Sequence, residues 1–173
     1  GIVVVSHSPA LAEAAVNLAL AMTVGQSPRI EIAAGAVDDV IGTDALRIVD
    51  AIKKVSSSKG VLVIMDLGSA IMSSEMALEF IDDKALDVRL SKGPFVEGLL
   101  AAVVRAVGGG SLDEVEYEAA NALLAKVSQL SATSEIIIND QSSDSKTSLK
   151  PEISGQAILV NAIGLHARPA AMI

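Results

Sequence analysis

Two unbroken runs of apolar residues constrain the fold of this chain more than any other feature. Residues 2–5 (IVVV) and 60–65 (GVLVIM) contain no polar side chain, whereas a strand with one face in water would alternate apolar and polar positions. Such runs are typical of central strands in a parallel sheet that helices cover on both faces. A longer segment with the apolar spacing of a helix follows each run, as expected for successive βαβ units.

Two further strands are expected at residues 29–33 and 86–90, with helices at 9–24, 43–56, 69–81, 94–107 and 111–127. Thr43 is the expected N-cap of the second helix. The side of the first helix that we expect to face the core carries Leu11, Ala14, Ala15, Leu18 and Met22. Right-handed crossovers limit how four parallel strands can be arranged. We therefore predict an α/β fold with a doubly wound, mostly parallel four-stranded sheet in the order 2-1-3-4 and helices on both faces.

The domain organisation is predicted from shifts in composition. Residues 1–128 are expected to form one domain. Residues 129–154 are rich in Ser, Asp and Lys and are predicted to be a flexible linker, in which residues 136–138 could add an extra edge strand. Residues 155–173 resume a strand-like pattern but are too few to bury a core, so we interpret them as the incomplete start of a second domain.

Charge and composition exclude several classes of function. The chain has 13 basic and 21 acidic residues, a net charge of −8, and so lacks the clustered Lys and Arg that bind nucleic acid. It has no cysteine and only two histidines without metal-ligand spacing, so no metal site is expected. The absence of cysteine fits a cytoplasmic location. No apolar run approaches the ~20 residues needed to span a membrane, so no membrane insertion is expected.

The two histidines, His7 and His166, each follow an expected strand. His7 comes after the first strand, and Asp66 comes after the third. In the order 2-1-3-4 these strands are neighbours, and ligands bind beyond the carboxyl ends of the strands where the order reverses. We therefore expect His7 and Asp66 to meet at a ligand crevice.

A histidine–carboxylate pair in that place suits phosphoryl chemistry. A carboxylate that accepts one imidazole N–H fixes the tautomer, leaves the other nitrogen free to attack phosphorus, and stabilises the positive charge that develops. Helix N-termini favour anions. The residues that open the next expected helix, Gly68, Ser69 and Ala70, are therefore the expected phosphate-binding residues, with Gly35 and Thr43 as candidates for the rim.

Other interpretations of these residues stay open. His7 could be a hydrogen-bonded structural residue, and Asp66 could only cap the following helix. Ser6 or Ser8 could be a hydrolase nucleophile beside His7. Adjacent residues of a strand point to opposite faces, however, and no Gly-x-Ser-x-Gly turn is present.

Four motifs resemble those of one protein family: Val5-Ser6-His7-Ser8, Ile41-Gly42-Thr43-Asp44-Ala45, Met65-Asp66-Leu67-Gly68-Ser69-Ala70 and Ser74-Glu75-Met76-Ala77-Leu78-Glu79. They look like the phosphotransferase subunit of bacterial dihydroxyacetone kinase. The first domain of that subunit is similar to the mannose-type enzyme IIA domain of the phosphoenolpyruvate:sugar phosphotransferase system. The resemblance covers residues 1 to about 128.

The resemblance implies an enzyme, a phosphotransferase that works through a phosphohistidine intermediate without a bound cofactor. It implies that His7 accepts the phosphoryl group, that Asp66 orients His7, and that Gly68, Ser69 and Ala70 hold the phosphate. Enzyme I and the phosphocarrier protein would supply the phosphoryl group, and ADP on the nucleotide-binding kinase subunit would receive it. Because mannose-type domains are usually dimeric, a homodimer is also implied.

Residues 164–170 (GLHARPA) resemble the active-site motif of the histidine-containing phosphocarrier protein. This resemblance implies that residues 155–173 are the incomplete start of an α+β phosphocarrier domain. It also implies a second phosphorylation site at His166, with Arg168 pairing with its phosphate. We do not expect His166 to be active here, because the sequence stops after one strand and the start of one helix of that domain.

Two related functions are alternatives. Mannose-type domains also serve as phosphorylation-responsive modules of regulatory proteins, and as sugar-transport enzymes IIA that pass phosphate to a permease component. The molecule that receives the phosphoryl group separates these functions from transfer to ADP.

Overall fold

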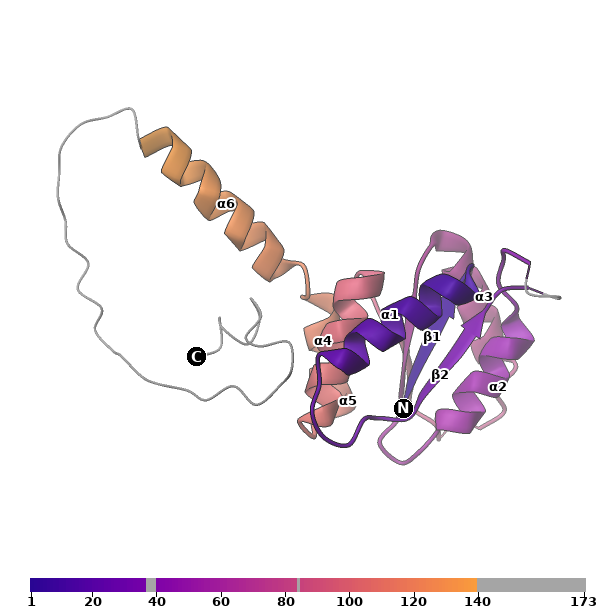
Figure 1. Ribbon diagram of the computed structural model, residues 1–173. Coiled ribbons are helices and arrows are strands. Elements are labelled where there is room, and N and C mark those ends of the chain that lie inside the picture. The colour runs from indigo at the N-terminus through magenta and orange to yellow at the C-terminus, as the bar shows by residue number, and fades with distance from the viewer. Residues whose placement is uncertain (37–39, 84, 140–173) are drawn as a thin grey trace. The chain divides into compact units, whose positions relative to one another are not determined.

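The computed structural model describes residues 1–36, 40–83 and 85–139 (Figure 1). The chain divides into two compact units, Gly1–Leu123 and Leu124–Ile173. The first unit contains β1 (Ile2–Ser6), α1 (Pro9–Ala21), β2 (Ile30–Ala34), α2 (Ala45–Val55), β3 (Val61–Met65), α3 (Gly68–Glu79), β4 (Val88–Leu90), α4 (Phe95–Val107) and α5 (Leu112–Ala120). In the second unit, the described part is helix α6 (Leu124–Asn139).

The four strands are parallel and lie in the order β2-β1-β3-β4, which confirms the predicted α/β fold. In the register, Val5 near the end of β1 pairs with Ala33 of β2 and with Met65 of β3. Just beyond that pair, the Asp66 N–H donates to the Val5 carbonyl at 3.2 Å. The residues that follow β1 and β3 therefore begin side by side.

Side chains of the central strands alternate between two cores, one on each face of the sheet. Ile2 and Val4 pack with α1, α4 and α5, whereas Val3 and Val5 pack with α2 and α3. Figure 1 shows these two groups of helices on opposite sides of the sheet. Because the strands are covered on both faces, their apolar runs are unbroken, and burying each such side chain contributes about 1.5–3 kcal/mol.

Helix α1 faces the core with a side that only partly overlaps the predicted one, because Ala15 is buried as expected but Ala14 is exposed. Ala12, Ala15 and Ala19 are buried, whereas Leu11 and Leu18 are 44% and 47% exposed. The helix is apolar on more than one side, so the apolar spacing did not select a single face. The small alanine side chains allow a close fit of the helix against the sheet.

The N-cap of α2 also differs from the prediction. Asp44, not Thr43, is the cap, because its carboxylate accepts the N–H groups of Leu46 at 2.8 Å and Arg47 at 3.4 Å. Both residue types cap helices, but the charge of Asp also interacts favourably with the positive end of the helix dipole.

The helix expected over residues 111–127 is divided between α5 and α6. Ser111 and Glu114 form the capping box at the start of α5, and Asn121 caps its end by donating its backbone N–H to the Tyr117 carbonyl at 3.1 Å. Residues 136–138, considered as an edge strand, belong to α6, so that prediction was wrong.

The proposed second domain, including His166 and Arg168, lies outside the described residues, as does most of the expected linker. The domain boundaries therefore stay predictions. Among the helices of the described part, none has the length and apolar character needed to cross a membrane.

Candidate functional site

The site lies in the connection from β1 to α1. Ser6 is the last residue of β1, and His7 follows at the carboxyl end of the sheet. Ser8 caps α1 by accepting the Leu11 N–H at 3.3 Å, and Pro9 occupies the first helical position, where its fixed φ suits a helix start. Because strand and helix are joined by only two residues, the position of the His7 backbone is closely defined.

The structure brings His7 and Asp66 together. The ring Nδ1 of His7 lies 2.9 Å from Oδ1 of Asp66, and the backbone N–H of His7 donates to Oδ2 of the same carboxylate at 2.8 Å. From the other side, the Gly42 N–H donates to the His7 carbonyl at 3.1 Å. Both the ring and the backbone of His7 are therefore held in place.

The Asp66 carboxylate accepts four hydrogen bonds. Oδ1 accepts the His7 ring N–H and the Leu67 N–H at 2.7 Å, while Oδ2 accepts the His7 backbone N–H and the Ser6 hydroxyl at 2.9 Å. A carboxylate offers about four lone-pair positions, so this one is fully satisfied.

These hydrogen bonds also decide the charge of Asp66. Burial alone would raise the pKa of Asp66, but the bonds from His7, Ser6 and Leu67 outweigh burial and hold the pKa below its usual value. Asp66 is thus an anion at neutral pH, and the ring nitrogen facing it carries the proton. The lone pair of the neutral imidazole is therefore on Nε2.

Nε2 of His7 points toward the start of α3 and lies 2.5 Å from the Ser69 hydroxyl. Because Nε2 holds the lone pair, the Ser69 hydroxyl is the donor. The His7 side chain is 18% exposed, compared with 6% for Asp66. The Asp66 carboxylate is therefore more deeply buried than the His7 ring, and the contact between Nε2 and Ser69 is exposed.

The predicted phosphate-binding residues are not equivalent in the structure. Gly68 and Ser69 are exposed first residues of α3, where backbone N–H groups have no partner within the helix. A Cβ added at Gly68 would have no atom within 4 Å, so space is open there. Ala70 is buried, and its N–H donates to the Leu67 carbonyl at 2.9 Å, which leaves Gly68 and Ser69 as the exposed part of this helix start.

The two candidate rim residues, Thr43 and Gly35, form hydrogen bonds that connect elements next to the site. The hydroxyl groups of Thr43 and Ser73 lie 2.7 Å apart and connect the segment before α2 to α3. Gly35 is buried, has φ +75°, and donates its N–H to the Ser6 carbonyl at 3.1 Å. It therefore holds the end of β1 and does not line an exposed rim.

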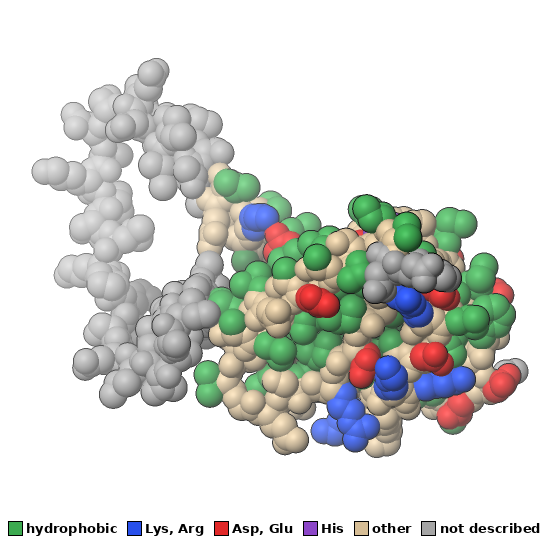
Figure 2. Space-filling model, turned by 45° about the vertical axis from the view of Figure 1, so that its right-hand side comes forward, with side chains coloured by type: hydrophobic (Ala, Val, Ile, Leu, Met, Phe, Trp, Pro, Cys, Tyr) green, Lys and Arg blue, Asp and Glu red, His purple; other side chains and the backbone are tan. Residues whose placement is uncertain are grey.

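Exposed apolar side chains adjoin the site. Leu67 follows Asp66 and is 61% exposed, Ile41 precedes Gly42 and is 79% exposed, and Leu11 of α1 is 44% exposed. Figure 2 shows that hydrophobic side chains reach the surface at many places, while Lys and Arg side chains are interspersed with Asp and Glu. Exposed apolar side chains such as these suit contact with another protein.

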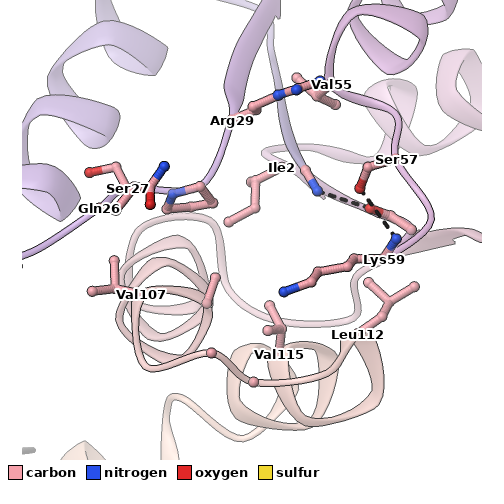
Figure 3. A pocket seen from close by; sticks show the side chains of 16 residues that line it. Ile2, Gln26, Ser27, Arg29, Val55, Ser57, Lys59, Val107, Leu112 and Val115 are labelled. Carbon is pink, nitrogen blue, oxygen red and sulfur yellow. Dashed lines mark hydrogen bonds between the residues drawn. The ribbon is translucent and has the colours of Figure 1, made fainter.

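A hollow of about 470 Å³ lies at the other end of the sheet (Figure 3). Its lining includes Ile2 at the start of β1, Arg29 before β2 and Lys59 before β3, but neither His7 nor Asp66. His7 is thus separate from this hollow.

Sequence reasoning missed the contacts that Ser6, Leu67 and Gly42 make around the His7–Asp66 pair. One signal for Ser6 was available. It lies two residues after Val4 on a central strand whose two faces are both expected to be covered, so a polar side chain there must find a buried partner. No comparable signal marks the backbone N–H groups of Leu67 and Gly42.

Comparison with a family model covers the part of the chain that contains this site. Residues 1–116 match the model of EIIA-man, described as the PTS system fructose IIA component. The chain belongs to the EIIA-man family. The matched region contains His7, Asp66 and the start of α3, which together form the site described above.

Curated relatives of this EIIA-man chain bear names of kinase subunits. It is 41% identical over 175 residues to the "PEP-dependent dihydroxyacetone kinase, phosphoryl donor subunit DhaM" of Providencia stuartii, with 99% of this chain and 36% of that protein covered. A relative from Listeria innocua, named as phosphoryl donor subunit DhaM of dihydroxyacetone kinase 2, is 35% identical over 121 residues, with 69% and 96% covered. The chain therefore spans about a third of the longer relative and nearly all of the shorter one.

A solved structure supports the fold of this EIIA-man domain. The crystal structure of a protein of unknown function, EF1359, has a TM-score of 0.60 and 31% sequence identity to this chain. It covers 69% of this chain and 92% of its own.

Proposed function

We propose that this chain is a phosphoryl carrier that accepts a phosphoryl group on Nε2 of His7 from the phosphocarrier protein and passes it to ADP on the nucleotide-binding subunit of a dihydroxyacetone kinase. The observation that carries the proposal is the arrangement of the His7 ring, with Nδ1 against the Asp66 carboxylate and Nε2 toward the start of α3. The phosphoryl-donor-subunit names of the relatives support the choice of a kinase as partner.

In the accepting step, the Nε2 lone pair of His7 attacks phosphorus of the donor phosphohistidine. The new N–P bond forms as the donor N–P bond breaks, and the donor imidazole recovers its lone pair. The His7 ring becomes cationic, because Nδ1 keeps its proton, and the Asp66 carboxylate stabilises that charge. Ser69 must turn its hydroxyl away from Nε2, after which it can donate to a phosphoryl oxygen beside the N–H groups of the α3 start.

In the donating step, a terminal phosphate oxygen of ADP attacks the same phosphorus from the side opposite Nε2. The N–P bond breaks, ATP forms, and the electron pair of that bond returns to Nε2. Phosphoryl transfer depends mainly on positioning and electrostatics, so the protein's part is to present the group in a fixed orientation.

Both partners of this proposal are proteins, which agrees with the exposed apolar residues Leu11, Ile41 and Leu67 around the site. The proposal retains two expectations from the family resemblance and composition, a homodimer and a cytoplasmic location. It also retains the expectation that no cofactor is bound and that phosphohistidine is the covalent intermediate.

Single-turnover transfer tests the acceptor. The chain is labelled with radioactive phosphoenolpyruvate, enzyme I and phosphocarrier protein, then separated from them and mixed with the ADP-loaded kinase subunit. We expect the label to leave the protein and appear in ATP. Retention of the label would favour the regulatory alternative, and transfer only to a permease component would favour the sugar-transport alternative.

The hydrogen bonds that join Asp66 to His7 and His7 to Ser69 are also those of a Ser-His-Asp hydrolase. The Ser69→Ala variant therefore distinguishes phosphoryl acceptance on His7 from hydrolysis by a serine nucleophile. As a phosphoryl acceptor, the variant should still be labelled on His7, about tenfold more slowly, because one hydrogen bond to a charged phosphoryl group is lost. Mass spectrometry locates the label and quenched time courses give the rate. A variant that accepts no label, together with ester hydrolysis by the unmodified protein, would assign Ser69 as a nucleophile.

A further inference from the structure

Ser6 is a fully buried polar residue at the carboxyl end of the central strand β1. Its side chain is 0% exposed, although Ile2 and Val4, which lie on the same face of β1, are apolar. Its hydroxyl lies 2.9 Å from Oδ2 of Asp66 and accepts the Ser8 N–H at 3.1 Å. A buried hydroxyl in a central strand is costly unless its hydrogen bonds are made, so these contacts account for its presence.

The Ser6 hydroxyl has one proton and two acceptors within reach. Oδ2 of Asp66 is anionic and lies at 2.9 Å, while the Ser8 carbonyl is neutral and lies at 3.1 Å. Charge-assisted hydrogen bonds are shorter and stronger than neutral ones, so the proton is directed to Asp66. The Ser8 N–H occupies one lone pair of the hydroxyl and helps to set this direction.

We propose that Ser6 is a positioning residue that keeps the Asp66 carboxylate in the rotation that aims Oδ1 at Nδ1 of His7. Ser6 does not touch the reacting atoms. It acts through Asp66, and Asp66 in turn decides which ring nitrogen of His7 carries the proton. An effect of Ser6 on the rate of phosphoryl transfer rests on the proposed function. An effect of Ser6 on which ring nitrogen of His7 carries the proton does not.

The geometry shows why the hydroxyl is needed. Among the residues that the structure describes, the donors to Oδ2 are the Ser6 hydroxyl and the His7 backbone N–H. The Asp66 side chain is 6% exposed, so water can replace Ser6 only with difficulty. Without Ser6, one oxygen of a buried anion is left short of a donor. A carboxylate that rotates to recover a donor moves Oδ1 from the ring, and the Nδ1–H tautomer loses its advantage. The other tautomer has no lone pair on Nε2.

The test is Ser6→Ala, with ¹⁵N signals of the His7 imidazole as the main readout. In the unmodified protein the neutral ring should be almost entirely the Nδ1–H tautomer. In Ser6→Ala we expect a measurable population with the proton on Nε2, and phosphorylation of His7 slowed about five- to tenfold, the effect typical of one lost hydrogen bond.

Ser74→Ala is the matched control, because Ser74 is also 0% exposed and makes one clear hydrogen bond, from its hydroxyl to the Ala70 carbonyl at 2.7 Å. Like Ser6→Ala, this variant removes one buried hydroxyl, but that hydroxyl bonds Ala70 and not Asp66. The His7 signals should therefore be unchanged. Ser6→Thr retains the hydroxyl in a side chain suited to strands and should restore the Nδ1–H tautomer.

A folded Ser6→Ala protein with the same His7 tautomer as the unmodified chain would overturn the proposal. Equal changes in Ser6→Ala and Ser74→Ala would also overturn it, since they would reflect lost packing alone. If Ser6→Thr does not fold, the Ser6→Ala and Ser74→Ala pair decides the question. If the unmodified chain accepts no phosphoryl group, the proposed function fails, but the tautomer measurement still tests Ser6.

Discussion

Replacing His7 with alanine should reduce phosphoryl incorporation into residues 1–128 to background, a loss of more than about 10³-fold. Nε2 of His7 is the nucleophile in the proposed reaction, and the nearest hydroxyl, that of Ser69, has no base once the imidazole is removed. The experiment uses phosphoenolpyruvate, enzyme I and phosphocarrier protein as the donor system. The label should be acid-labile, as expected for a phosphoramidate.

The control for this experiment concerns the second histidine. Because His166 lies in a motif that resembles a phosphorylation site, proteolysis and mass spectrometry must assign the label to a peptide. A His166→Ala variant should label His7 at the rate of the unmodified chain. Undiminished label within residues 1–128 of the His7→Ala variant would refute the assignment of His7 as the acceptor.

Replacing Asp66 with asparagine should lower the rate of phosphoryl acceptance by about 10²- to 10⁴-fold, as loss of the orienting carboxylate does in hydrolytic triads. The Asp66 carboxylate faces four donors, but an amide offers one acceptor oxygen and an NH₂ group. If the NH₂ group faces His7, Nδ1 must accept and the proton moves to Nε2, which can then no longer attack phosphorus. The negative charge that stabilises the cationic ring is also lost.

The rate loss in Asp66→Asn is measured by quenched time courses, and the variant's stability is measured alongside by reversible unfolding at several pH values. Because the pKa of Asp66 is depressed in the folded protein, its ionised form stabilises the fold above the ordinary carboxyl pKa, and this contribution disappears as pH falls through the folded pKa. The asparagine variant should therefore be less stable than the unmodified chain at neutral pH, and the difference should shrink in acid. A variant that accepts phosphate at full rate would show that Asp66 does not orient His7.

The pairing of His7 with Asp66 could be expected from the sequence because it depends on topology. Two unbroken apolar runs identify β1 and β3 as central strands, and right-handed crossovers make them neighbours. Residues that follow such strands must then meet at one edge of the sheet. No knowledge of side-chain packing is needed for that step.

Features that depend on close packing or on competing local signals could not be predicted in the same way. The buried side of α1 is decided by how near Ala12 and Ala19 allow the helix to approach, although Leu18 has the larger apolar side chain. Thr43 and Asp44 are both good N-caps, and only the backbone geometry selects Asp44. The four donors around Asp66 include two backbone N–H groups, which every sequence contains and no motif marks.

The site continues the hydrogen-bond ladder between β1 and β3 by one step. The Asp66 N–H donates to the Val5 carbonyl, and the Asp66 side chain returns to accept the His7 N–H. Central strands belong to the regions that open least often, whereas reactive groups on loops follow the faster fluctuations of the surface. The position of His7 is therefore expected to change only when the hydrogen bonds between β1 and β3 break. When another protein docks, the conformational changes should occur mainly in exposed side chains such as Ser69 and in the partner protein.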